Sequence, residues 1–141
     1  MAEAVLKNSK ISTTEEFFDY VKTAGKLRTA DHARTWTRGT LNMLGVNIDR
    51  GVKKELANAL PEEFVKWLKG GPWLLHFRDT NISSYEFQNR VARRSSNSDP
   101  QFAYYPVKAV FGGLKRLLDQ NVGQNLADNL SPELREIWNE A

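Results

Sequence analysis

The chain has 141 residues, of which 40% are hydrophobic and 26% charged, and it contains no cysteine. This length and composition are typical of one small globular domain, and the absence of thiols excludes disulfides, thiolate metal sites and cysteine nucleophiles. The formal net charge of +3 permits a nucleic-acid partner without indicating one.

Residues 1–11 are predicted to form an extension before the helical part of the chain. They contain no apolar run of signal-peptide length, and no stretch of the sequence reaches the roughly 20 apolar residues that a bilayer span needs. We therefore expect a cytoplasmic protein without a membrane span.

The next segment, residues 12–70, has the signals of four helices. Thr13-x-x-Glu16 is a capping box at the start of the first helix. A second helix begins near Ala30 and is expected to stop at Gly45, because glycine commonly ends a helix. Asp49 is suited to cap the third helix, and Pro61 opens the fourth, where proline is tolerated in the first turn.

Residues 71–82 are predicted to join two helical units. Gly-Gly-Pro ends the preceding helix, and the apolar residues that follow are unusual for a solvated linker. We expect Trp73, His76 and Arg78 to lie at the junction of the two units, where a small-ligand pocket is one open alternative.

Residues 83–141 repeat the helix signals of the first unit. Ser83-x-x-Glu86 is a second capping box, and Asp119 is suited to cap a helix. Pro106 indicates either a helix start or a kink within a helix. Gly112 and Gly113 are expected to let another helix approach closely.

The chain also matches itself at an offset of 70 residues. Between residues 12 and 71, eleven of sixty aligned positions are identical, and most are apolar anchors or helix-start residues. We interpret this as a tandem duplication of a four-helix unit. The predicted fold is all-α, with about eight helices in one compact domain and units at 12–70 and 83–141.

The sequence resembles the bacterial domain of unknown function 2267 family. The resemblance rests on HARTWTRGTLNMLG before LANALPEEFVKWL, and on the capped EFQNRV start of the second unit. Tyr104, Tyr105 and Pro106 depart from the more usual polar helix start. The resemblance implies two copies of a helical unit, and it implies no activity, cofactor or catalytic residue.

No catalytic or metal-binding pattern is evident. The chain has two histidines, His32 and His76, and neither has HxxxH or HxxE spacing to a partner. The adjacent pair Glu62 and Glu63 is explained by the positive end of a helix dipole. We therefore predict no enzyme activity, no cofactor and no metal.

The arginines are the strongest indication of a binding surface in the sequence. Arg90, Arg93 and Arg94 fall at i, i+3 and i+4 of one helix, and Arg34 and Arg38 fall at i and i+4 of another. Tyr104 and Tyr105 follow soon after the first group, so an anionic groove or a phosphate-contact face is possible in principle. Solvated helix faces are the alternative interpretation.

Three hypotheses about function stay open at this point. The first is a non-catalytic protein-interaction or scaffold module, with a protein as the partner. The second is a nucleic-acid-contacting protein that uses the basic helix faces. The third is a small-ligand binder or enzyme with a pocket at the junction. The candidate interaction residues are Arg34, Arg38, Trp73, His76, Arg78, Arg90, Arg93 and Arg94.

Overall fold

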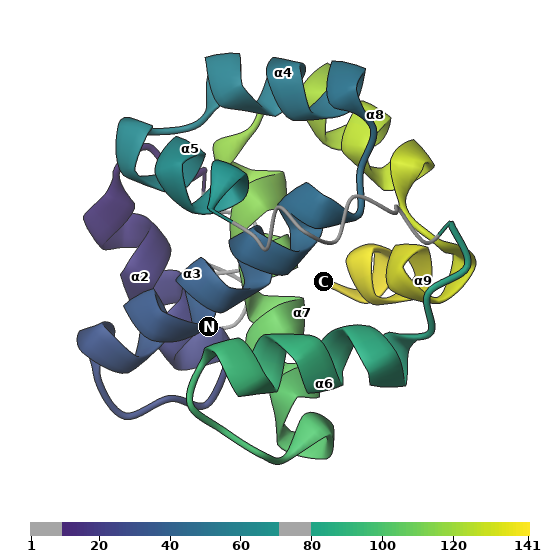
Figure 1. The fold of residues 1–141 in the computed structure, drawn as a ribbon. Helices are drawn as coiled ribbons and strands as arrows, with labels where there is room; N and C mark the ends of the chain where they lie inside the picture. The colour runs from purple at the N-terminus through teal and green to yellow at the C-terminus, as the bar shows by residue number, and fades with distance from the viewer. Residues whose placement is uncertain (1–9, 71–79) are drawn as a thin grey trace.

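The computed structural model describes residues 10–70 and 80–141, and within these ranges the chain forms eight α-helices and no strand (Figure 1). The predicted all-α fold is confirmed. The first half contains α2 (Thr14–Ala24), α3 (Ala30–Val46), α4 (Arg50–Ala59) and α5 (Glu62–Lys69). The second half contains α6 (Ser84–Arg94), α7 (Pro100–Leu117), α8 (Gln120–Asn129) and α9 (Pro132–Glu140). No described helix has both the length and the apolar character needed to cross a membrane.

Side-chain caps begin most of these helices. Thr13 Oγ1 accepts a hydrogen bond from the amide of Glu16 at 3.1 Å, and Ser83 Oγ accepts one from the amide of Glu86 at 3.0 Å, as the capping boxes predict. Asp49 caps α4. Asp119 occupies the N-cap position of α8, as predicted, but in the described structure its side chain makes no capping hydrogen bond there.

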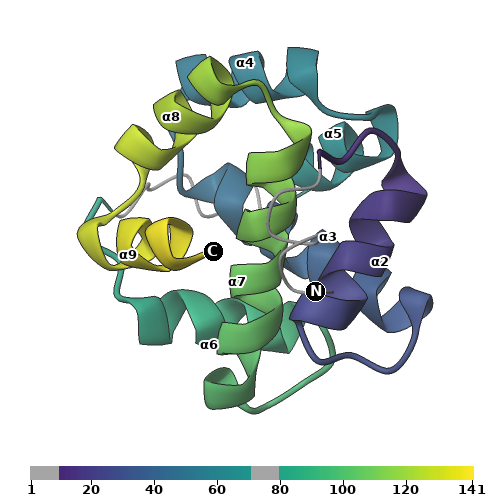
Figure 2. The ribbon, with the colours of Figure 1, turned by 180° about the vertical axis from the view of Figure 1, so that it is seen from behind.

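The two long helices, α3 and α7, form the centre of the fold (Figures 1 and 2). The first helix of each half packs on the long helix of the other half: α2 contacts α7, and α6 contacts α3. The side chains that fill this core are fully buried, and burying each contributes about 1.5–3 kcal/mol. The fully buried aromatic members are Phe17, Trp36, Phe64, Phe87 and Phe111. Because the first helix of each half packs on the long helix of the other half, neither half encloses its core alone.

The helices of the two halves lie at nearly equivalent positions along the chain at the 70-residue offset. Helices α2 and α6 begin and end at equivalent positions, and so do α4 and α8. Lys26 and Ser96, the residues with positive φ outside glycine in the described chain, are also equivalent, and both have a φ of 59°. Helices α4 and α8 lie side by side, where Asn129 and Asp49 exchange two hydrogen bonds (Figure 1). Duplication of one ancestral unit stays a prediction.

Two glycines of α7 allow a close helix contact. A Cβ atom at Gly113 would lie 2.6 Å from Cε2 of Phe17, and one at Gly112 would lie 2.5 Å from the hydroxyl of Tyr20. Both neighbours belong to α2, so the predicted close approach of another helix is confirmed. Figure 2 shows α2 lying against α7.

Gly45 and Pro106 behave differently from the expected helix breakers. Helix α3 continues through Gly45 to Val46, so the predicted stop is wrong. A Cβ atom on Gly45 would collide with the backbone carbonyl of Leu68, which means that the glycine lets α5 approach α3. A helix start at Pro106 is also wrong, because α7 begins at Pro100 and contains Pro106.

Candidate functional site

Arg34 and Arg38 lie on consecutive turns of α3, and both are exposed. Arg34 forms a salt bridge with Glu63 of α5, and its guanidinium carbon lies 5.3 Å from the ring centroid of Trp67. Among the described residues, the side chain of Arg38 makes no salt bridge or hydrogen bond. Asn42 occupies the following turn, and its side-chain amide donates to the carbonyl of Trp67 at 2.6 Å.

The arginines of α6 meet this row where α6 crosses α3. At the crossing, a Cβ atom on Gly39 would touch Ser95, the residue after α6, and the carbonyl of Val91. Arg94 reaches α3 directly, because its Nε donates to Oδ1 of Asn42 at 3.2 Å. Spacing in the sequence places the arginines on faces of their own helices. The packing of α6 on α3 then brings Arg94 to the α3 row.

Arg90 and Arg93 extend the cluster along α6. Arg90 lies one turn before Arg94 and forms a 2.8 Å salt bridge with Glu86. Arg93 is exposed and, within the described chain, has no salt bridge or hydrogen bond through its side chain. We call the five side chains Arg34, Arg38, Arg90, Arg93 and Arg94 the arginine face.

Carboxylates and an aromatic ring belong to the same surface. A hollow of about 430 Å³ is lined by Arg34, Glu62, Glu63, Lys66 and Trp67. Trp67 is partly buried against the core, and the guanidinium of Arg34 lies over its ring. The face therefore offers paired charges and an aromatic side chain as well as unpaired cations.

Of the eight candidate interaction residues, the structure describes five, and Arg94 links the two rows through its contact with Asn42 of α3. The other three, Trp73, His76 and Arg78, lie outside the described residues, and so does the ligand pocket proposed at the junction. Sequence reasoning also placed Tyr104 and Tyr105 with the arginines of α6. That interpretation is wrong, because Tyr104 donates a hydrogen bond to Glu140 of α9 and Tyr105 contacts Lys26 beyond the end of α2.

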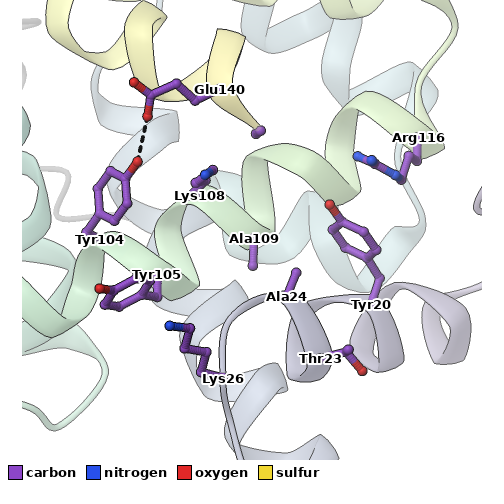
Figure 3. Close-up of a pocket in the computed structure, with 11 residues that line it drawn as sticks. Tyr20, Thr23, Ala24, Lys26, Tyr104, Tyr105, Lys108, Ala109, Arg116 and Glu140 are labelled. Atoms are coloured by element: carbon purple, nitrogen blue, oxygen red, sulfur yellow. Dashed lines mark hydrogen bonds between the residues drawn. The ribbon is translucent and has the colours of Figure 1, made fainter. Parts of the chain in front are cut away.

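These tyrosines line a groove that sequence reasoning missed (Figure 3). It lies between α2, α7 and α9, and its volume is about 590 Å³. We call it the tyrosine groove. Its ring-bearing and charged side chains are Tyr20, Lys26, Tyr104, Tyr105, Lys108, Arg116 and Glu140.

A cation lies over each tyrosine ring of the groove. Lys26 Nζ is 4.5 Å from the ring centroid of Tyr105, and Arg116 Cζ is 4.6 Å from that of Tyr20. Lys108 Nζ lies 5.7 Å from the centroid of Tyr104. Such contacts help to hold long cationic side chains in place, because each is favourable by about 0.5–1 kcal/mol at exposed sites. Figure 3 shows the Tyr20–Arg116 pair and the Lys26–Tyr105 pair separated by Ala24 and Ala109, which face each other.

Two of the tyrosines hold their protons more strongly than usual. The hydrogen bond to Glu140 at 2.5 Å, together with burial, raises the pKa of Tyr104 to about 12. Burial raises the pKa of Tyr20, and the nearby charge of Arg116 opposes this effect. Both hydroxyls therefore remain hydrogen-bond donors at neutral pH.

Replacing Glu140 with glutamine is expected to lower the pKa of Tyr104 from about 12 toward its ordinary value of 10.0. The carboxylate favours the protonated phenol, so this hydrogen bond stabilises the fold below pH 10 and the contribution is lost as the pH rises toward 12. A pH titration of tyrosine ring signals by NMR measures the shift. Glu136→Gln on the same helix should leave the Tyr104 titration unchanged, and an unchanged value in Glu140→Gln would contradict the assignment.

The arginine face and the tyrosine groove occupy corresponding positions of the two halves. At the 70-residue offset, Arg34 corresponds to Tyr104 and Arg38 to Lys108, while Arg90 corresponds to Tyr20. The supporting helices correspond as well, because α6 packs on α3 as α2 packs on α7. The residues 70 positions away from the candidate arginines line the groove, so the internal match of the sequence could have located it.

No metal centre accompanies these surfaces within residues 10–70 and 80–141, where no three His, Asp or Glu side chains gather as metal ligands. A comparison with protein families matched residues 14–137 to a family described as "Uncharacterized conserved protein (DUF2267)". The chain belongs to the DUF2267 family. A comparison with curated proteins found no match.

The DUF2267 match includes both surfaces almost completely. It begins at the start of α2 and ends within α9, so it contains the whole arginine face. In the tyrosine groove it contains Tyr20 through Arg116, and Glu140 lies beyond it. The resemblance predicted from the sequence is thus confirmed, and the family description assigns no reaction to either surface.

Proposed function

We propose that the protein is a non-catalytic interaction module that binds another protein through the arginine face. The proposal is supported by one observation: side chains from three helices converge at the α3–α6 crossing and form a surface of mixed character. Its cations lie beside carboxylates and a partly buried tryptophan. Protein interfaces are enriched in arginine and aromatic residues, and their central contacts often involve tryptophan and arginine.

The carboxylates favour a protein partner over a nucleic acid. Glu63 pairs with Arg34, and Glu86 pairs with Arg90, so two of the five guanidinium groups are already neutralised. A phosphate backbone would be repelled by the same carboxylates. A protein surface can offer a carboxylate to one part of the face and a cation to another, which makes mixed charge a basis for specificity.

Arg38 and Arg93 are the observation that favours the nucleic-acid alternative. Both are exposed, and neither makes a salt bridge within the described chain. If all five arginines contacted phosphates, affinity would fall about 500-fold between about 50 and 200 mM salt, because each neutralised phosphate contributes to the salt dependence. This steep dependence separates the alternative from the proposed function.

Affinity purification from the source cells at these two salt concentrations, with and without nuclease, tests the proposed function. We expect a protein that is retained after nuclease treatment and loses little binding at the higher salt concentration. Capture of nucleic acid that disappears at the higher salt concentration would contradict the proposed function and support the alternative.

A further inference from the structure

We propose that the tyrosine groove is a second binding site, which accepts a short, extended, acidic segment of a partner protein. The inference does not depend on the arginine face, because the two surfaces share no residue and lie on different helix pairs. It rests on the charge, the length and the aromatic contacts of the groove.

The charge of the groove fits an anionic ligand. Lys26, Lys108 and Arg116 line it, and Glu140 is the one carboxylate side chain among its described lining residues. Glu140 accepts a hydrogen bond from the Tyr104 hydroxyl and keeps its negative charge, so three cationic side chains face one carboxylate side chain in the groove. A carboxylate that reaches them gains charge-assisted hydrogen bonds.

The length of the groove fits an extended peptide. Tyr104 and Arg116 mark its two ends on α7, and at 1.5 Å per residue they are separated by about 18 Å along the helix axis. About five residues of extended chain span the same distance at roughly 3.3 Å each. Acidic side chains along such a segment could reach Arg116 at one end and Lys26 at the other.

The aromatic contacts favour a peptide over a single-stranded nucleic acid. Nucleic acids use open aromatic faces as stacking platforms for bases. Here a cation already lies over the ring of Tyr20, Tyr104 and Tyr105. The rings hold the cations in position, and the protonated Tyr20 hydroxyl can donate to a carboxylate.

A ¹⁵N–¹H NMR titration of the whole chain with an acetylated hexaglutamate peptide tests this inference. We expect the amide signals of residues 20–26, 104–109 and 116 to move, and the double variant Lys26→Glu/Lys108→Glu to weaken binding at least tenfold. The double variant Lys53→Glu/Lys54→Glu on α4 carries the same charge change and should bind as the wild type does. The wild-type shift map locates the site even if the first variant folds poorly.

Three results would overturn the inference. Shifts confined to α3 and α6 would place the peptide on the arginine face, and equal loss in both lysine variants would show a general charge effect. Larger groove shifts with the six-nucleotide oligomer (dT)₆ would identify a nucleic-acid site instead. Arg38→Glu/Arg93→Glu should keep its groove shifts, so failure of the proposed function and failure of this site give different results.

Discussion

Replacing Gly45 with alanine is expected to lower the free energy of unfolding by about 2 kcal/mol. The added Cβ atom would collide with the backbone carbonyl of Leu68, at the point where α5 packs on α3. A backbone oxygen cannot move aside as a flexible side chain can, so the two helices must separate. The better helix propensity of alanine, about 1 kcal/mol, offsets only part of this cost. Urea unfolding followed by circular dichroism measures the change.

Gly51 provides the matched control for this prediction. It lies in α4 and is exposed, and a Cβ atom there would have Asp49 Oδ1 as its nearest neighbour, at an ordinary contact distance of 3.5 Å. Gly51→Ala should therefore stabilise the protein by about 0.5–1 kcal/mol through helix propensity alone. If both variants changed stability by the same amount, close packing at Gly45 would not be the reason for its glycine.

The helices could be predicted because their signals are local. Thr13 and Ser83 cap the helices that their sequence spacing indicates, since the hydroxyl and the amide it binds are three residues apart. Gly45 shows the limit of this reasoning. Its role depends on the Leu68 carbonyl, which is distant in sequence, so the glycine was mistaken for a helix stop.

The candidate site could be predicted only within each helix. Helical spacing placed Arg34 with Arg38, and Arg90 with Arg94, on common faces. That the two faces meet follows from the packing of α6 on α3, which helix periodicity alone does not specify. The salt bridge between Arg34 and Glu63 could not be predicted either, because it depends on how α5 packs on α3.

Tyr104 and Tyr105 were wrongly grouped with the arginines of α6 because they are near them in the sequence. They follow α6 closely in the chain, yet the turn of α7 that carries them faces α2 and α9. The groove draws its residues from three helices, and its charges match no pattern of short spacing. Transferring the arginine positions by 70 residues would have indicated Tyr20, Tyr104 and Lys108 directly.

The double variant Arg38→Glu/Arg93→Glu is expected to reduce capture of the protein partner at least tenfold, which corresponds to about 1.4 kcal/mol. Both side chains are exposed, and neither makes a salt bridge among the described residues, so the change should spare the fold. It replaces two exposed cations of the arginine face with carboxylates, which would repel the partner carboxylates that the arginines are proposed to bind. Quantitative mass spectrometry of the captured proteins measures the loss.

Lys53→Glu/Lys54→Glu is the control, because it carries the same charge change on α4, which Figure 1 shows at the opposite end of the molecule from α6. Comparing capture by the wild type and these two variants, after nuclease treatment and at the higher salt concentration, tests the proposed function most directly. The proposal predicts that the arginine variant loses the partner and the lysine variant keeps it. Equal capture by all three proteins would show that the arginine face does not bind the partner.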